Sequence, residues 1–221
     1  MKLFSYCLRY DDGAAPNPFW GICTLTICKP AIRRTASIGD WVVGTGSKKV
    51  RGHGDLSNRL VYAMKITDKK TLKEYDSFCR EKAPKKIPDW EHRDYRRRLG
   101  DCLYDYSTKP PIQRKGVHNK KNVKTDLSGK NSLISNHFYY FGDKPIAIPE
   151  SLKPIVLQRQ GHRKDLNETY IPLFLEWIEG QNLELNTLYG NPQLNIFDDP
   201  ACQSACIKFR ATEIDIEEKI C

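Results

Sequence analysis

The chain has 221 residues, of which 39% are hydrophobic and 29% are charged, and its formal net charge is +9. This composition is typical of a globular protein, and it excludes a membrane span because no run of 18 apolar residues occurs. The first residues lack the apolar stretch of a signal peptide, so we expect a cytoplasmic protein whose eight cysteines are reduced.

The positive charge is concentrated in the middle of the chain. Residues 48–130 contain 23 basic and 11 acidic side chains, whereas residues 131–221 are acidic overall. A one-sided excess of this size is typical of proteins that bind polyanions. Because no basic helix with a wide apolar face accompanies it, we expect the partner to be a nucleotide, DNA or RNA rather than a membrane.

Four strands are predicted in the N-terminal third of the chain from alternation and from β-branched or aromatic content. Their expected bounds are Lys2–Tyr10, Trp20–Cys28, Trp41–Gly44 and Leu60–Ile66. In the first strand, every second residue from Phe4 onward is aromatic or leucine, so this face should be buried. The cysteines in such runs are expected to act as small hydrophobic residues.

A helix is predicted next, with apolar residues at helical spacing from Leu72 to Cys79 and a cap at Thr67 or Asp68. Residues 80–130 are interpreted as a basic, largely irregular insertion, in which 109–130 form a long surface loop. Its exposed lysines are expected to contact phosphates, and they are Lys115, Lys120, Lys121 and Lys124.

The C-terminal part predicts a strong strand at Ser132–Phe141, a helix at Thr169–Glu179 capped by Thr169, and a closing strand at Cys206–Ala211. Six or more strands with two or three helices, without regular alternation, favour an α+β fold. We interpret residues 1–221 as a single domain.

No known catalytic motif is present, and no pair of cysteines has the spacing of a zinc site, so no metal is expected and no cofactor is indicated. For an enzyme, Asp40 and Asp126 are the candidates for a general base. The three histidines of the basic middle, His118 among them, have no carboxylate at a recognisable spacing.

A nucleotide site is suggested around the second strand. Arg33 and Arg34 are predicted to lie in a loop, where guanidinium groups can bind phosphate or stack on a base. Trp20, close to Asn17 and a proline turn, can serve as a stacking platform. The alternatives are two solvated arginines and a tryptophan that belongs to the core.

The aromatic strand offers a second part for this site. His137 and Tyr139 should share one face, and of Tyr139 and Tyr140 one ring should be buried and the other available. We expect these residues and the two arginines to converge on one concave surface. There His137 could stack on a base, and the alternative is that it packs in the core.

Two sequence blocks carry a family resemblance. The run YDDGAAPNPFWGICTLTICKPAIRRTASIGDWVVGTGS and the later block SLISNHFYYFG, within residues 1–162, resemble the second nucleotide-modification-associated domain family. This resemblance implies an association with DNA base modification in phages and bacteria. It implies no catalytic residues.

A weaker resemblance concerns the fold. The succession KPAIRR, GDWVVG and LVYAMKI is similar to PUA-like and EVE-like domains. It implies a mixed or antiparallel β-barrel with flanking helices that holds a modified or flipped base. We therefore expect a protein that binds a modified base, a nucleotide or nucleic acid. The alternatives are an enzyme of base modification, such as a transferase or a glycosylase-like enzyme, and an adaptor without a nucleotide site.

Overall fold

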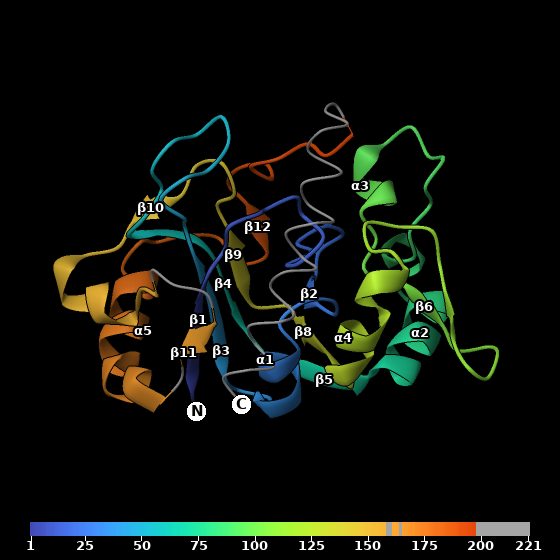
Figure 1. Ribbon diagram of the computed structural model, residues 1–221. Coiled ribbons are helices and arrows are strands. Elements are labelled where there is room, and N and C mark those ends of the chain that lie inside the picture. The colour runs from blue at the N-terminus through green and yellow to red at the C-terminus, as the bar shows by residue number, and fades with distance from the viewer. Residues whose placement is uncertain (158–160, 164, 198–221) are drawn as a thin grey trace.

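The computed structural model describes residues 1–157, 161–163 and 165–197 (Figure 1). These residues form a seven-stranded mixed sheet, a three-stranded sheet, a two-stranded hairpin and several short helices. The predicted α+β class is therefore confirmed. None of the sheets closes into a barrel within the described residues, so the PUA-like barrel is not confirmed. The predicted strand Cys206–Ala211 lies outside the described residues.

The large sheet is mixed because β1 runs parallel to β3, whereas β3, β4 and β9 are antiparallel neighbours. Its order is β11 (His162–Arg163), β1 (Leu3–Cys7), β3 (Trp41–Thr45), β4 (Arg59–Lys65), β9 (Phe138–Tyr140) and β12 (Thr187–Leu188), with β10 (Ile146–Ala147) also paired to β4.

The second sheet is antiparallel, with the order β2 (Cys23–Leu25), β8 (Asn131–Ser135) and β5 (Asp68–Thr71). The prediction of one strand at Ser132–Phe141 is wrong, because β8 and β9 belong to different sheets. Between them the Ser135 hydroxyl donates to the Lys65 carbonyl and accepts the amide N–H of His137. These bonds stabilise the bend that moves the chain from one sheet to the other.

Both faces of the large sheet are buried. Phe4 and Tyr6 pack toward the small sheet and α1 (Pro30–Thr35), as their predicted alternation requires. The opposite face carries Tyr139, which packs in a separate cluster with Phe174 of α5 (Ile171–Glu179). Tyr140 is fully buried on the first face, so the prediction that one of the two tyrosine rings is available is wrong. Neither ring is available, because both faces of the large sheet are covered by other parts of the chain.

Helix α5 covers one side of the large sheet, and on its other side lies the small sheet, beyond which α2, α3 and α4 are arranged (Figure 1). The bounds of the helices are α1 (Pro30–Thr35), α2 (Leu72–Glu81), α3 (Tyr95–Arg98), α4 (Val123–Ser128) and α5 (Ile171–Glu179), with 3-10 turns η1 (Pro84–Lys86), η2 (Lys120–Asn122), η3 (Glu150–Ile155) and η4 (Asp165–Tyr170). No helix in the described part of the chain is long and apolar enough to cross a membrane.

Two predicted caps are wrong. Thr71 caps α2, with its side chain accepting the Glu74 amide while the Glu74 carboxylate accepts the Thr71 amide. Thr67 and Asp68 cannot do so because Asp68–Thr71 are already strand β5. Similarly, Thr169 lies inside η4, and α5 begins at Ile171.

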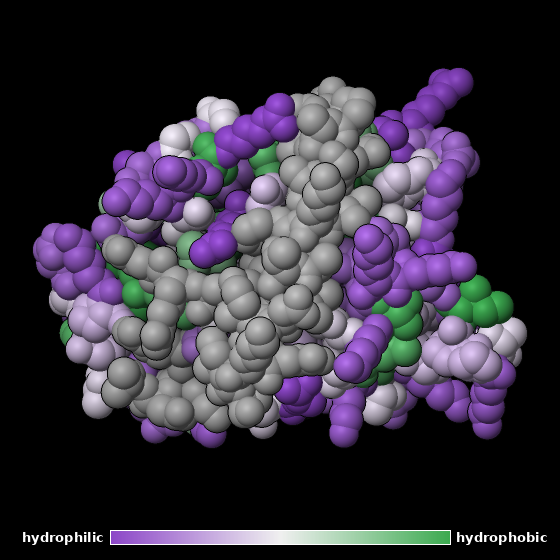
Figure 2. Space-filling model, viewed as in Figure 1, coloured by the Kyte–Doolittle hydropathy of each residue, from purple (hydrophilic) through white to green (hydrophobic). Residues whose placement is uncertain are grey.

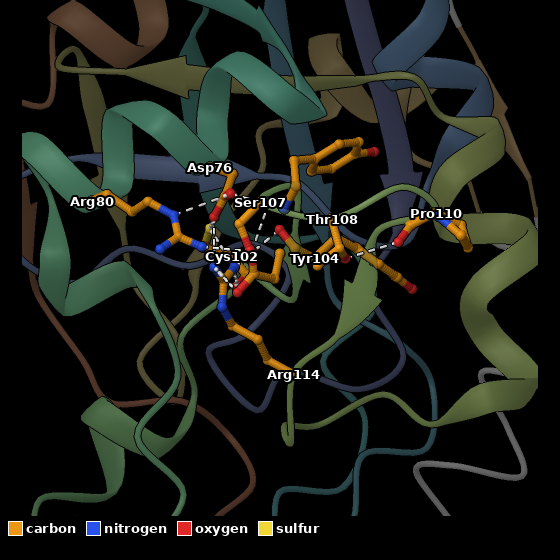
Figure 3. A network of polar contacts seen from close by, with 10 residues as sticks. Asp76, Arg80, Cys102, Tyr104, Ser107, Thr108, Pro110 and Arg114 are labelled. Atoms are coloured by element: carbon orange, nitrogen blue, oxygen red, sulfur yellow. Dashed lines mark hydrogen bonds and ion pairs between the residues drawn. The ribbon is translucent and has the colours of Figure 1, made fainter.

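The basic segment 80–130 is more ordered than predicted. It contains α3, η2, α4 and a hairpin of β6 (Tyr104–Asp105) and β7 (Ile112–Gln113). Figure 3 shows how the hairpin is attached to α2. Asp76 of α2 accepts from Arg114 at 2.6 Å and from Arg80 at 3.2 Å, and Arg114 also donates to the Tyr104 carbonyl. This network fixes the position of Tyr104.

Candidate active site around Cys28

Cys28 lies at a sharp turn between strand β2 and helix α1. It has φ 59°, and Lys29, which follows it, has φ 42°. Residues other than glycine rarely adopt this left-handed conformation, which costs energy and is found most often at functional sites. Pro30 then starts α1, because its fixed φ suits the first helical position. A nucleophile at a strained strand–helix turn is a recurrent arrangement in enzymes.

The sulfur of Cys28 faces a histidine and an aspartate from a distant part of the chain. The Cys28 Sγ atom lies 3.5 Å from Nε2 of His118. The other ring nitrogen of His118, Nδ1, lies 2.6 Å from Oδ2 of Asp126. We call Cys28, His118 and Asp126 the Cys28 triad. A thiol, an imidazole and an orienting carboxylate in this order form the arrangement of cysteine-dependent acyl-transfer enzymes.

Asp126 holds both the histidine and the backbone of the cysteine. Its Oδ1 accepts the amide N–H of Cys28 at 3.2 Å, and its Oδ2 accepts the Tyr104 hydroxyl at 2.9 Å as well as His118. The carboxylate is almost completely buried. Since Tyr104 is fixed by the network of Figure 3, the carboxylate that orients His118 is fixed from two directions.

Arg33 ties the elements of the site together from beneath. Its fully buried guanidinium donates to the carbonyls of Cys28, Asn131 and Asp126 at 2.7, 3.0 and 2.7 Å. A Cβ atom on Gly129 would lie 2.2 Å from this guanidinium, so only glycine leaves room for it. Arg33 thus fixes the end of β2, the start of β8 and helix α4 relative to one another.

The electrostatics of the triad favour a protonated histidine. Burial opposes the charge of His118, but the Asp126 carboxylate and Cys28 outweigh it and raise the histidine pKa to about 9. Burial likewise works against the charge of Asp126, but the charge of His118, its hydrogen bond and Arg33 keep the aspartate pKa below its usual value. At neutral pH the pair is therefore an imidazolium and a carboxylate.

This arrangement can support nucleophilic chemistry at sulfur. Nε2 of His118 lies within hydrogen-bonding distance of the sulfur, and the thiolate is the reactive form of a cysteine. Cys28 is half-buried, whereas the other cysteines in the described part of the chain, Cys7, Cys23, Cys79 and Cys102, are buried. Within these same residues, no group of three histidine, cysteine or carboxylate side chains is arranged to hold a metal ion.

The structure corrects the predicted surroundings of the two arginines. Arg33 and Arg34 lie in helix α1, not in a loop. The Arg33 guanidinium is committed to three backbone carbonyls, as described above. Arg34 is exposed, and its Nη1 donates to the Ser128 carbonyl at 3.1 Å. Only Arg34 therefore presents a guanidinium to the solvent.

The structure does not bring His137 and Tyr139 to the arginines. His137 packs edge-on against Trp41 and Tyr139, on the face of the large sheet that α5 covers. Helix α1, through Ile32, packs on the opposite face. The expected concave surface joining these residues is therefore not formed, because the sheet separates them.

Asn17 and Trp20 lie near each other but differ in surroundings. Asn17 is buried, accepts from the Lys86 ammonium and donates to the Leu99 carbonyl. Trp20 is half-buried, and the ammonium of Lys85 lies over its ring at 4.7 Å. Asn17 is thus committed to the core, whereas Trp20 reaches the surface.

The remaining predicted residues fall into two groups. Both carboxylate oxygens of Asp40 accept backbone amides, those of Lys2 and Ser37, at 2.7 and 2.9 Å. Asp40 thus stabilises a turn, as its neighbouring glycine also suggests. The predicted phosphate-contacting residues are all exposed, and they are Lys115, Lys120, Lys121 and Lys124. The last three lie between His118 and Asp126 in the chain.

Sequence reasoning named Asp126 as a candidate general base, and it singled out neither Cys28 nor His118 for the site. The interpretation of His118 as lacking a carboxylate partner was wrong, since Asp126 lies eight residues away with η2 and the start of α4 between them. Cys28 and His118 are 90 residues apart, and no spacing rule connects them. The one local signal was the position of Cys28 between a strand and Pro30.

Comparisons with known proteins identify the family of this chain. The model of the family described as nucleotide modification associated domain 2 matches residues 1–198, which include the whole Cys28 triad. No curated protein and no solved structure matches the chain. Because the family model covers most of the chain, this protein belongs to the nucleotide modification associated domain 2 family.

Proposed function

We propose that this protein is an enzyme of nucleotide modification that transfers or hydrolyses an acyl group through Cys28. The observation that carries the proposal is the contact of the Cys28 sulfur with a histidine that a buried aspartate orients. Membership of the family supplies the association with nucleotides. The role first considered for Asp126, a general base, becomes that of the residue that orients and charges His118.

The proposed reaction has two half-reactions. The Cys28 thiolate attacks the carbonyl carbon of the acyl group, a C–S bond forms, and the bond to the leaving group breaks. The His118 imidazolium gives its Nε2 proton to the leaving group. A water molecule or an acceptor amine or hydroxyl then attacks the thioester and gives its proton to His118. The thiolate leaves, and the imidazolium–thiolate pair is restored.

The surroundings of the triad fit an anionic substrate. Lys120, Lys121 and Lys124 are exposed on the segment that connects His118 to Asp126. These lysines could bind a phosphate on the same segment that carries His118 and Asp126, the two residues that activate the thiol. This observation also favours a second candidate function, the recognition of a nucleotide or a modified base without catalysis.

A generic acyl donor distinguishes the two functions without knowledge of the natural substrate. The protein is incubated with p-nitrophenyl acetate, release of p-nitrophenolate is followed, and the site of acetylation is mapped by peptide mass spectrometry. We expect a burst of product and one hydroxylamine-sensitive acetyl group on Cys28. Acetylation at Cys28 should disappear in Cys28→Ala and slow at least about tenfold in His118→Gln.

A specific outcome contradicts the enzymatic proposal. If no thioester forms at Cys28, or if His118→Gln acetylates Cys28 as fast as the wild type, the triad does not activate the thiol. Binding of a nucleotide without catalysis is then the better account. The His53→Gln variant is the matched control, because it changes an exposed histidine that contacts the Gln193 carbonyl and leaves the whole triad in place.

A further inference from the structure

Aromatic rings and cations gather on both sides of helix α3. Over the ring of Trp20 lie Lys85 Nζ at 4.7 Å and Arg96 Cζ at 5.1 Å. On the other side the Arg98 guanidinium lies 3.9 Å from the ring of Phe197, which packs edge-on against Trp90. We call the rings of Trp20, Trp90 and Phe197, with the cations that lie over them, the tryptophan surface. In Figure 2, hydrophilic side chains extend at the upper right, where Figure 1 places α3.

A cavity of about 400 Å³ opens beside Trp20. Its walls are largely apolar, and the positive charges in them belong to lysines at the C-terminal end of α2 and in η1. The lining includes Trp20, Ile22, Phe78, Lys82, Pro84 and Lys85. This volume lies within the range of small-ligand pockets. A flat aromatic wall, an apolar floor and two exposed ammonium groups suit a nucleobase with an attached phosphate.

Two buried donors at this surface have no hydrogen-bond partner. They are Nε1 of Trp20 and Nε of Arg98, and the other unpartnered side-chain nitrogen in the described residues belongs to Trp41, in the core. A buried donor without a partner is costly, and native proteins rarely leave one. Both donors belong to side chains of the tryptophan surface, Trp20 and the Arg98 that lies over Phe197.

The backbone presents Trp20 in an unusual way. Trp20 has φ 68° and Gly21, which follows it, has φ 79°. A tryptophan in the left-handed region is a rare conformation, and this turn holds the indole half out of the core, against the cavity. The turn also places the ring next to η1, which carries Lys85.

The charge of the region is one-sided. Residues 82–98 carry seven basic and three acidic side chains. Two of the acids are already paired, Asp94 with Arg96 and Glu91 with Lys115. Stacking on a tryptophan is worth more than an exposed cation–aromatic contact, so a base can displace a cation from the Trp20 ring onto its own phosphate.

From these observations we infer that the tryptophan surface binds single-stranded nucleic acid, with one base in the cavity beside Trp20 and the strand continuing past α3 toward Trp90. The substrate of the proposed enzyme is then a base within a strand rather than a free nucleotide, and this part of the inference rests on the proposed function. Aromatic rings alternating with cations are the way in which single strands are held without sequence preference.

Fluorescence anisotropy tests the inference with labelled single-stranded DNA of about 20 nucleotides, a length that spans several stacked bases. The same sequence as a duplex and free dTMP serve as competitors. Trp20→Ala should weaken binding by about tenfold or more, and Trp20→Phe should restore most of it because a phenyl ring also stacks. The duplex and dTMP should compete at least about tenfold less well than the unlabelled strand.

A matched pair of double variants tests the charges. Lys82→Gln with Lys85→Gln removes two charges at the cavity, and Lys48→Gln with Lys49→Gln removes two exposed charges elsewhere. Only the first pair should reduce the slope of the logarithm of the binding constant against the logarithm of the salt concentration. The expected reduction is about 1.4, for two phosphate contacts to a single strand. The inference is overturned if Trp20→Ala binds like the wild type, if both pairs weaken binding equally, or if dTMP competes as well as the strand.

Binding and catalysis can fail separately in this design. Cys28→Ala should bind the strand with the affinity of the wild type, because Cys28 is not part of the tryptophan surface. If the wild type binds the strand but forms no thioester at Cys28, the proposed function alone is contradicted. Normal acetylation at Cys28 with no effect of Trp20→Ala on binding contradicts the inference alone.

Discussion

Protonated His118 should make the stability of the protein depend on pH. The histidine pKa is about 9 in the folded protein and 6.5 for the free side chain. Because the folded-state value is the higher one, the stabilisation is fully present below pH 6.5 and is lost as the pH rises through 9. The difference corresponds to about 3 kcal/mol of unfolding free energy, as an order of magnitude.

The His118→Gln variant isolates this contribution. Unfolding by urea, followed by tryptophan fluorescence, gives the unfolding free energy of both proteins across the pH range. All other titrating groups are shared, so the wild type should exceed the variant by about 3 kcal/mol more near pH 6 than near pH 10. If the difference between the two proteins is independent of pH, Asp126 does not hold His118 in its protonated form and the electrostatic account of the triad is wrong.

Three further predictions concern groups buried around the site. Gly129→Ala should lower the unfolding free energy by about 3 kcal/mol, because its methyl group displaces the Arg33 guanidinium; urea unfolding equal to that of the wild type would argue against this contact. Lys86→Met should cost about 3–5 kcal/mol in the same assay, since the fully buried ammonium lies within hydrogen-bonding distance of four oxygens that would lose their shared donor; a variant as stable as the wild type would show that these bonds contribute nothing. Burial raises the pKa of Asp11 to about 7 from 3.8, so its contribution is present below 3.8 and is lost as the pH rises through 7. The melting temperature of Asp11→Asn relative to the wild type should therefore rise between about pH 5 and pH 8, and a constant difference would contradict the shift.

The parts of the fold that could be predicted were those determined by local pattern. Alternation in β1 gives the correct buried face, since Phe4 and Tyr6 do pack together in the core. Helices α2 and α5 were found from their apolar spacing, with errors only at the caps. The spacing of apolar residues indicates which residues share a helix face, and α2 and α5 each bury one such face.

The parts that could not be predicted depend on contacts between distant segments. The division of Ser132–Phe141 into β8 and β9 is revealed only by their partner strands, which belong to different sheets. The triad joins residues 90 positions apart, and its histidine lies in a segment whose composition indicated a solvated loop. From sequence alone, Arg33, a buried arginine that donates to three carbonyls, cannot be distinguished from a surface arginine that binds phosphate.

The most direct test of the Cys28 triad is the rate at which each cysteine reacts with iodoacetamide in the native protein, measured by mass spectrometry. In the wild type, Cys28 should react faster than Cys7, Cys23, Cys79 and Cys102, which are buried. His118→Gln and Asp126→Asn should each slow alkylation of Cys28 by about tenfold or more, whereas His53→Gln, which changes an exposed histidine outside the triad, should change it little. If Cys28 reacts no faster than the buried cysteines, or if both variants leave its rate unchanged, the three residues do not act as a catalytic unit.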